Sequence, residues 1–150
     1  MKKILAIITV AAITAMAGSA MAATTSTDLT VSASVSEVCT AVTNTNIDFG
    51  NLDPVGDPAT TSTATKTGAT RGVINVKCTQ GTGYKLSAPA TATIANGGDT
   101  ITYTPVVPLA DFTGIVAGTS HTIDATVDKS AYASVPTGAY AGTLTVTVTY

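Results

Sequence analysis

The segment Gly142-Thr-Leu-Thr-Val-Thr-Val-Thr-Tyr150 alternates threonine with apolar side chains. Such alternation is typical of a β-strand with one face in a core, because successive side chains of a strand point to opposite faces. We therefore predict a core strand here, extending from about residue 139 to residue 150. Because the sequence given ends on this strand, we expect the strand's free edge to lack a later element that covers it.

A second alternating segment, Leu29-Thr-Val-Ser-Ala-Ser-Val35, lies near the other end of the chain. Its apolar residues share one face of an extended strand, and threonine and serine occupy the other. The segment is either the first strand of its own domain or a spare strand that covers the edge of a neighbouring copy. The residues alone leave both interpretations open.

The composition predicts an all-β domain. Threonine accounts for 31 of the 150 residues and charged residues for only 11%, and β-branched residues favour the pleated sheet. Alternation and turn residues, including the hairpin signal Asn96-Gly97, place the predicted elements. Strands are expected at 38–42, 46–49, 73–78, 84–86, 92–95, 100–104, 121–127 and 139–150, a loop over 50–70, and an edge or loop around Pro105 and Pro108. Roughly seven short strands predict an immunoglobulin-like sandwich.

Residues 1–22 have the pattern of a secretory signal peptide. Two lysines precede an apolar run over residues 4–17, and Ala20-Met-Ala22 has the small-residue form of a cleavage site. A membrane anchor is the alternative, but the run is shorter than the roughly 20 apolar residues that span a bilayer. We therefore expect export, followed by an N-terminal segment over 23–36 and a folded domain over 37–150.

Charge excludes two classes of partner. Without the two lysines of the signal segment, five basic and nine acidic residues remain. A weakly acidic chain with scattered basic residues has no electrostatic footprint for nucleic acid and no basic cluster for an anionic membrane surface. We expect no nucleic-acid partner and no membrane insertion.

The two cysteines, Cys39 and Cys78, are expected to form a disulfide, because an exported chain matures in an oxidising compartment. Closing a loop of about 40 residues stabilises a fold by about 4 kcal/mol in the chain-entropy model. With one histidine and no CxxC spacing, the sequence predicts neither a metal site nor thiol catalysis.

No catalytic constellation stands out. His121 lies near Ser120 and Asp124, but no nucleophile motif surrounds any serine. We expect a surface histidine on a strand and no enzymatic activity.

Two further groups fall short of ligand-binding motifs. Asp48, Asp53 and Asp57 lack the spacing of a calcium loop, so turn-forming or solvated carboxylates are expected. The stretch Lys66-Thr-Gly-Ala-Thr-Arg-Gly72 lacks the phosphate-binding glycine pattern. The sequence predicts no cofactor.

Several landmarks follow one another in a recognisable order. They are Cys39, Ile47-Asp-Phe-Gly50, Val76-Lys-Cys78, Tyr84-Lys-Leu86 and the ending Gly138-Ala-Tyr-Ala-Gly-Thr-Leu-Thr-Val-Thr-Val-Thr-Tyr150. In this order they resemble the spore coat U domain family, which includes the Csu-type pilins of archaic chaperone–usher systems. The resemblance covers nearly the whole chain after the signal segment. One departure is Gly142, where the family often has an acidic residue.

The resemblance implies an incomplete immunoglobulin-like sandwich that lacks its last strand. In such families a periplasmic chaperone first lends a strand to the open groove, and the N-terminal segment of the next subunit then replaces it. Matched by position, the donor strand is Leu29, Val31, Ala33 and Val35. The acceptor groove and chaperone contact are Leu144, Val146, Val148 and Tyr150, with the carboxylate of Tyr150 as an anchor on the chaperone.

The predicted function is that of a structural subunit of an extracellular pilus that supports adhesion or biofilm formation. Its predicted partners are identical or related subunits, a periplasmic chaperone and an outer-membrane usher. Head-to-tail contact of donor and groove does not close on itself and so produces a fibre. Insertion of the segment into its own groove competes with this, and the direction in which the chain leaves the sheet before Cys39 decides between them. The alternatives are a self-contained secreted β-sandwich coat or matrix protein and a minor or tip adhesive subunit.

Overall fold

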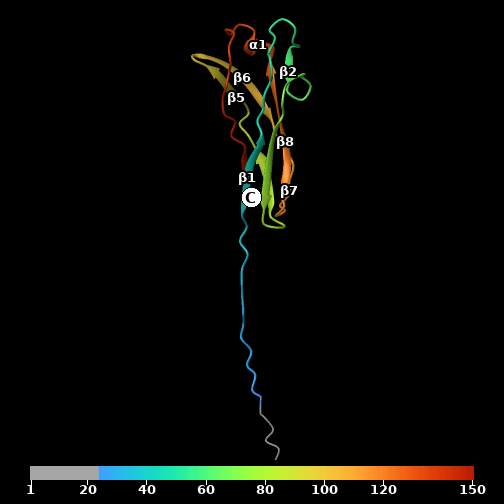
Figure 1. Ribbon diagram of the computed structural model, residues 1–150, viewed down its shortest axis with the longest axis vertical. Coiled ribbons are helices and arrows are strands. Elements are labelled where there is room, and N and C mark those ends of the chain that lie inside the picture. Colours follow the sequence, from blue (N-terminus) through green and yellow to red (C-terminus); the bar gives the residue numbers. More distant parts are fainter. Residues whose placement is uncertain (1–23) are drawn as a thin grey trace, which may run out of the picture. The chain divides into compact units, whose positions relative to one another are not determined.

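A computed structural model describes residues 24–150, so the predicted signal peptide lies outside the described residues. Residues 34–150 form one compact unit, and residues 24–33 belong to another. The larger unit (Figure 1) is almost entirely β. Its strands are β1 (Cys39–Thr45), β2 (Thr60–Ser62), β3 (Gly72–Cys78), β4 (Gly83–Ser87), β5 (Ala92–Asn96), β6 (Asp99–Val106), β7 (Phe112–Thr113), β8 (Thr119–Asp128) and β9 (Thr147–Thr149), with one short helix, α1 (Lys129–Tyr132).

The strands form two antiparallel sheets. The larger sheet has the order β1-β3-β8-β6-β5, with β2 paired to the last residues of β8, and the smaller sheet has the order β7-β4-β9. This architecture confirms the predicted all-β, immunoglobulin-like fold class.

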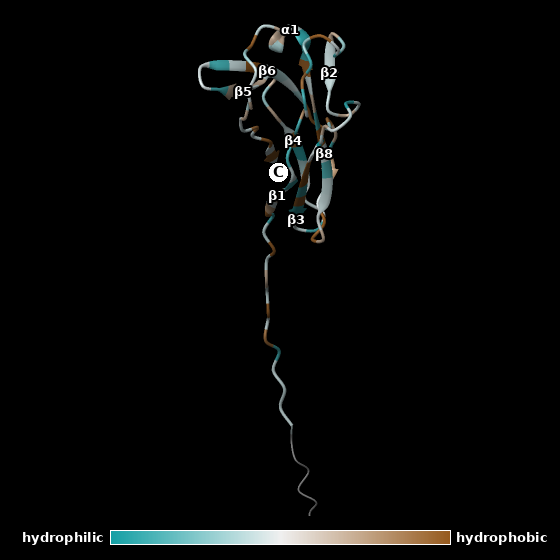
Figure 2. Ribbon diagram, turned by 45° about the horizontal axis from the view of Figure 1, so that its top comes forward, coloured by the Kyte–Doolittle hydropathy of each residue, from teal (hydrophilic) through white to brown (hydrophobic). Residues whose placement is uncertain are grey.

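Alternation on β3 and β8 builds the middle of the core. Ile74, Val76 and Cys78 of β3 are buried, and the residues between them are more exposed. The hydrophobic residues of β3 are visible as brown segments in Figure 2. On β8, Ile123 and Val127 are buried in the same way. Burying an aliphatic side chain of this size contributes roughly 1.5–3 kcal/mol, which makes these two strands the centre of the sandwich.

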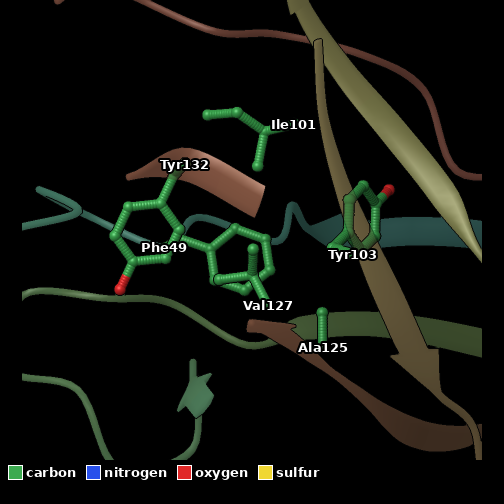
Figure 3. Packing of buried hydrophobic residues seen from close by; sticks show 6 residues of the cluster. All are labelled: Phe49, Ile101, Tyr103, Ala125, Val127 and Tyr132. Carbon is green, nitrogen blue, oxygen red and sulfur yellow. The ribbon is translucent and has the colours of Figure 1, made fainter. Parts of the chain in front are cut away.

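The core consists of two clusters of buried residues. The first contains Phe49, Ile101, Tyr103, Ala125, Val127 and Tyr132 (Figure 3). The second contains Ile74, Val76, Cys78, Tyr84, Leu86 and Ile123. The partly buried Ile47 packs against both. The groove described below is lined by residues of both clusters.

The β5–β6 hairpin confirms the turn predicted from Asn96-Gly97, with a small shift. Asn96 pairs with Asp99, so the two turn residues are Gly97 and Gly98. Gly97 has φ +61°, a conformation that side chains with a Cβ rarely adopt.

Two other predictions require correction. Residues 46–49 form only an isolated bridge, between Asp48 and Thr70, because β1 itself continues to Thr45. The predicted loop over 50–70 contains β2.

The prediction of an edge or loop around Pro105 and Pro108 agrees with the structure. Pro105 lies near the end of β6 opposite Ala125 of β8, at a point where β5 has already ended and the other side of β6 is unpaired. A proline is tolerated at such an edge. Pro108 lies in the loop after β6.

The predicted final strand over 139–150 is largely wrong. Ala141 forms an isolated bridge with Ala95 of β5, and only β9 pairs with β4. The chain therefore crosses from the larger sheet to the smaller one. Residues 142–146 belong to no strand. They connect the bridge to β5 of the larger sheet with β9 of the smaller sheet.

Gly142 permits this crossing. A Cβ at this position would lie 2.4 Å from the carbonyl oxygen of Thr93 and 3.2 Å from Cα of Ile94. Both are backbone atoms of β5, so they yield only if the strand itself moves.

We predict that Gly142→Ala destabilises the protein by about 1–3 kcal/mol, the usual cost of overpacking. Gly138→Ala is the matched control, because its Cβ would meet only the side-chain amide of Asn96, which can rotate away. Urea unfolding measures both variants. Equal unfolding midpoints for the two would contradict the close approach of residue 142 to β5.

Candidate functional site

A groove of about 890 Å³ opens between β1 and the C-terminal segment over 135–146. Its floor includes Ile74, Ile101, Tyr103 and Ile123, which come from both core clusters. Thr43 and Thr45 of β1 line one wall, and Leu144 and Val146 line the other. The groove therefore runs along the division of the core, between two segments at the edges of different sheets.

The inner face of β1 is exposed. In the register of β1 with β3, Ala41 lies opposite Val76, and Thr43 lies opposite Ile74. Side chains directly opposite one another in an antiparallel pair point to the same face, so Ala41 and Thr43 face the core side. Both are nevertheless exposed, whereas Val76 and Ile74 are buried. No side chain of residues 34–150 therefore covers this part of the sheet.

The wall of the groove that β1 forms is also an open strand edge, because β1 lies at the end of its sheet. An open edge presents backbone N–H and C=O groups that a further strand can pair with. The site thus combines an apolar floor with hydrogen-bonding groups on one wall, which is the chemistry that binds an extended, amphipathic peptide.

The four predicted groove residues lie in different surroundings, and only some of them line the groove. Leu144 and Val146 line the groove, and both are half-buried against the second core cluster. Val148 lies opposite Leu86 in the β4–β9 pair. Tyr150 remains 57% exposed. Leu144 and Val146 are therefore the two of the four that meet the groove within residues 34–150.

The predicted donor residues lie in an exposed stretch. Leu29 is 84% and Val31 91% exposed, Ala33 is exposed, and Val35 is 84% exposed. Residues 24–38, as described, contain no strand or helix. Among the described residues, the apolar side of this alternating segment is therefore exposed.

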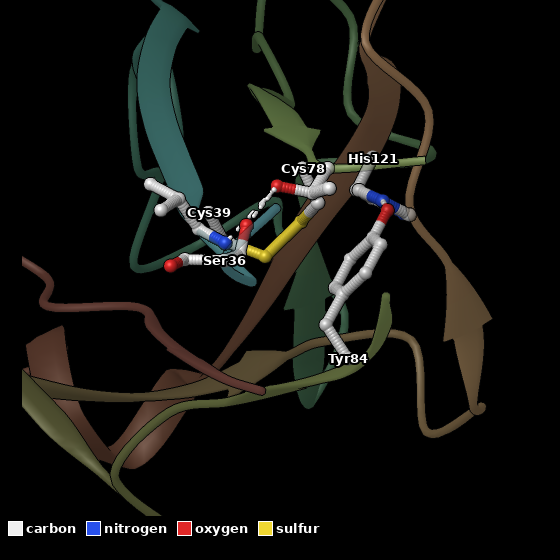
Figure 4. The surroundings of a disulfide bond; sticks show 7 residues. Ser36, Cys39, Cys78, Tyr84 and His121 are labelled. Carbon is white, nitrogen blue, oxygen red and sulfur yellow. Dashed lines mark hydrogen bonds between the residues drawn. A yellow bond between two sulfur atoms is a disulfide. The ribbon is translucent and has the colours of Figure 1, made fainter. Parts of the chain in front are cut away.

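The predicted disulfide between Cys39 and Cys78 is present. It joins directly opposed residues at one end of the β1–β3 pair, and Figure 4 shows it beside Ser36. It therefore fastens the start of β1, the first strand after the exposed stretch, to the end of β3.

His121 corrects the prediction of a surface histidine. It is 5% exposed, and its Nε2 lies 2.7 Å from the hydroxyl of Tyr84, as Figure 4 shows. The ring of Phe112 packs against it at 4.3 Å between centroids. Burial lowers the pKa of His121. The sequence did hold a signal for this burial, because His121 shares the face of Ile123 on an alternating strand.

Among residues 24–150, no Ser-His-Asp arrangement forms around His121. Asp124 instead accepts hydrogen bonds from the hydroxyls of Ser62 and Thr63, which fasten β2 to β8. These contacts are structural.

The acidic residues of the 48–57 region serve turns. Asp48 accepts a hydrogen bond from the N–H of Gly50, and Asp53 accepts one from the N–H of Val55. Asp57 forms an ion pair with Lys66, with 2.5 Å between Oδ1 and Nζ, and the hydrogen bond from Lys66 holds the pKa of Asp57 below its usual value. Among residues 24–150 no group of three or more histidine, cysteine or acidic residues is arranged to hold a metal ion.

Part of the chain matches a known protein family. Residues 24–104, more than half of the chain, match the family model of the Spore Coat Protein U domain. The chain belongs to the Spore Coat Protein U domain family. The matched region of this Spore Coat Protein U domain includes the alternating N-terminal segment, both cysteines and most of the larger sheet. No curated protein and no solved structure matches the chain.

Membership in the family fits a structural, pilin-type subunit and an association with surface structures. Within residues 24–150, no helix has the length and apolar character needed to cross a bilayer.

The burial of His121 predicts a loss of stability in mild acid. An unfolded chain takes up a proton near the ordinary histidine pKa of 6.5, whereas the folded protein resists protonation because its pKa is lowered. The stabilisation is therefore complete above about pH 6.5 and is lost as the pH falls towards the folded pKa. We expect the urea midpoint to drop between about pH 7.5 and about pH 5.

His121→Gln removes the titrating group while keeping a polar partner for Tyr84, and its midpoint is expected to change less over this range. The range stays above the region in which Asp53 and Asp57, with lowered pKa values, take up protons. Equal pH dependence in the two proteins would refute a neutral, buried His121.

Proposed function

We propose that this protein is a structural subunit of an extracellular pilus that polymerises by donor-strand exchange. The segment Leu29–Val35 of one copy inserts into the groove of the next copy and completes its sandwich. The observation that carries the proposal is the exposed inner face of β1 above the apolar floor of the groove. A complete sandwich would cover that face with its own strand.

The proposed donor has the alternation and the length of a short β-strand. In an extended strand, Leu29 and Val35 are about 20 Å apart, and every second residue between them points to the same side. Burial of three large aliphatic side chains contributes on the order of 5–8 kcal/mol before the cost of ordering the segment. The polar face, with Thr30 and Ser32, remains towards solvent, and the backbone pairs with the open edge of β1.

Donor and acceptor are different surfaces of the same molecule, so the contact is heterologous. Such contacts propagate into filaments when they do not close into a ring. Until the groove is filled, its open edge is an aggregation hazard, which is a physical reason for a chaperone that occupies it during export. We propose a periplasmic chaperone, an outer-membrane usher and related subunits as partners, and adhesion or biofilm formation as the role of the fibre.

Val31→Asp tests the assignment, because it places a charge on the face that enters the apolar groove. Burying an unpaired carboxylate costs several kcal/mol, so we expect the fibre to be lost while the subunit still accumulates with its chaperone. The matched control is Ser32→Asp, which adds the same charge one residue away on the solvent face. The measurement is gel electrophoresis of unboiled and boiled samples, in which strand-exchanged polymers give a ladder that heat abolishes.

The proposal predicts a ladder for the unmodified protein and for Ser32→Asp, and none for Val31→Asp. A ladder of equal strength in both variants would exclude Leu29–Val35 as the donor. A single monomer band from the unmodified protein would favour the self-contained coat or matrix protein.

A further inference from the structure

Thr79 holds the chain that precedes β1. The hydroxyl Oγ1 of Thr79 accepts a hydrogen bond from the N–H of Val38, at 3.2 Å, and donates one to the carbonyl of Ser36, at 3.0 Å. The N–H of Thr79 donates to the carbonyl of Val38, at 2.9 Å. One residue at the end of β3 therefore makes three hydrogen bonds to the stretch Ser36–Val38.

These bonds extend the β1–β3 ladder beyond the disulfide by an unusual route. Cys39 and Cys78 lie opposite each other, so Val38 and Thr79 form the next pair. In an ordinary ladder the carbonyl of Thr79 would accept from the N–H of Val38. That carbonyl instead accepts from the N–H of Thr82 in the turn that ends β3. The side chain of Thr79 takes the place of its own carbonyl, and the chain before Cys39 stays in line with β1.

This arrangement opposes a hairpin between the donor segment and β1 of the same molecule. Such a hairpin would bring Leu29–Val35 into the subunit's own groove, and its loop would be Ser36-Glu37-Val38. If Ser36 and Val38 became residues of this loop, they would lose their hydrogen bonds to Thr79. A three-residue hairpin loop also needs a residue with positive φ, and none of these three is a glycine or asparagine.

We propose that Thr79 is a positioning residue for polymerisation: it keeps the donor segment from turning back, so that the groove is filled by a second copy of the chain. This inference rests on the proposed function above. The hydroxyl acts by holding Ser36 and Val38, which follow the donor segment in the sequence. It does not enter the groove. Local sequence patterns do not predict this role, because it depends on hydrogen bonds between residues about 40 positions apart.

Thr79→Val removes the hydroxyl and retains the β-branched shape. We expect the ratio of monomer to heat-sensitive ladder to rise about tenfold in the exported product of the full chain, the change that two modest hydrogen bonds produce. Thr79→Ser keeps the hydroxyl and is expected to restore the original ratio. Thr40→Val is the matched control, since it makes the same substitution at an exposed position of β1.

A second measurement shows whether the new monomer has filled its own groove. Deleting residues 24–35 in the Thr79→Val background should lower the melting temperature of the monomer, because the donor segment then no longer completes the sandwich. Quantitation of free thiols before and after denaturation verifies that the Cys39–Cys78 bond is intact in every variant.

The outcomes separate this inference from the proposed function. If the unmodified protein forms the ladder and Thr79→Val forms it in the same ratio, the positioning role is refuted while strand exchange stands. If Thr79→Ser behaves like Thr79→Val, the hydroxyl is not responsible and the inference also fails. If the unmodified protein forms no ladder and deletion of residues 24–35 changes nothing, the proposed function falls and the inference falls with it.

Discussion

The inner face of β1 is open. Ala41 and Thr43 share their face with buried residues of β3, yet nothing in residues 34–150 covers them. The groove lies beside this open face, residues of both core clusters line it, and Leu144 and Val146 are only half-buried next to it. A strand that fills the groove would join the two clusters and pair with an edge that is otherwise a hazard for aggregation.

The open edge of β1 also gives a reason for the disulfide at the start of this strand. An edge strand with only β3 beside it separates from the sheet more easily than a central strand, because it makes hydrogen bonds on one side only. The Cys39–Cys78 bond and the contacts of Thr79 both fasten its first residues to β3. In a fibre, the donor segment would transmit tension to this point, so the fastening would protect β1 from being pulled away from the sheet.

Many of the strands were predictable from the sequence, and the predictions that were wrong have physical reasons. Strands β3, β4 and β8 and the β5–β6 hairpin follow from local alternation and turn residues. The C-terminal segment has equally clear alternation, but it changes sheets at Gly142, and pairing depends on neighbours that a local pattern does not encode. Short β2 depends on contacts with Asp124, far away in the sequence. The burial of His121 was encoded in its position on β8 and was outweighed by the polarity of the residue. The groove itself could be expected only through the family resemblance, since an exposed face on β1 is a tertiary property.

The structure of the assembled protein, by electron cryomicroscopy of its fibres or crystallography of a heat-sensitive dimer, would show what fills the groove. We predict an added strand between β1 and the C-terminal segment, with density that traces to Leu29–Val35 of a neighbouring subunit and apolar side chains directed onto Ile74 and Ile123. A groove filled by the subunit's own residues, or subunits joined through another surface with the groove left open, would contradict the account.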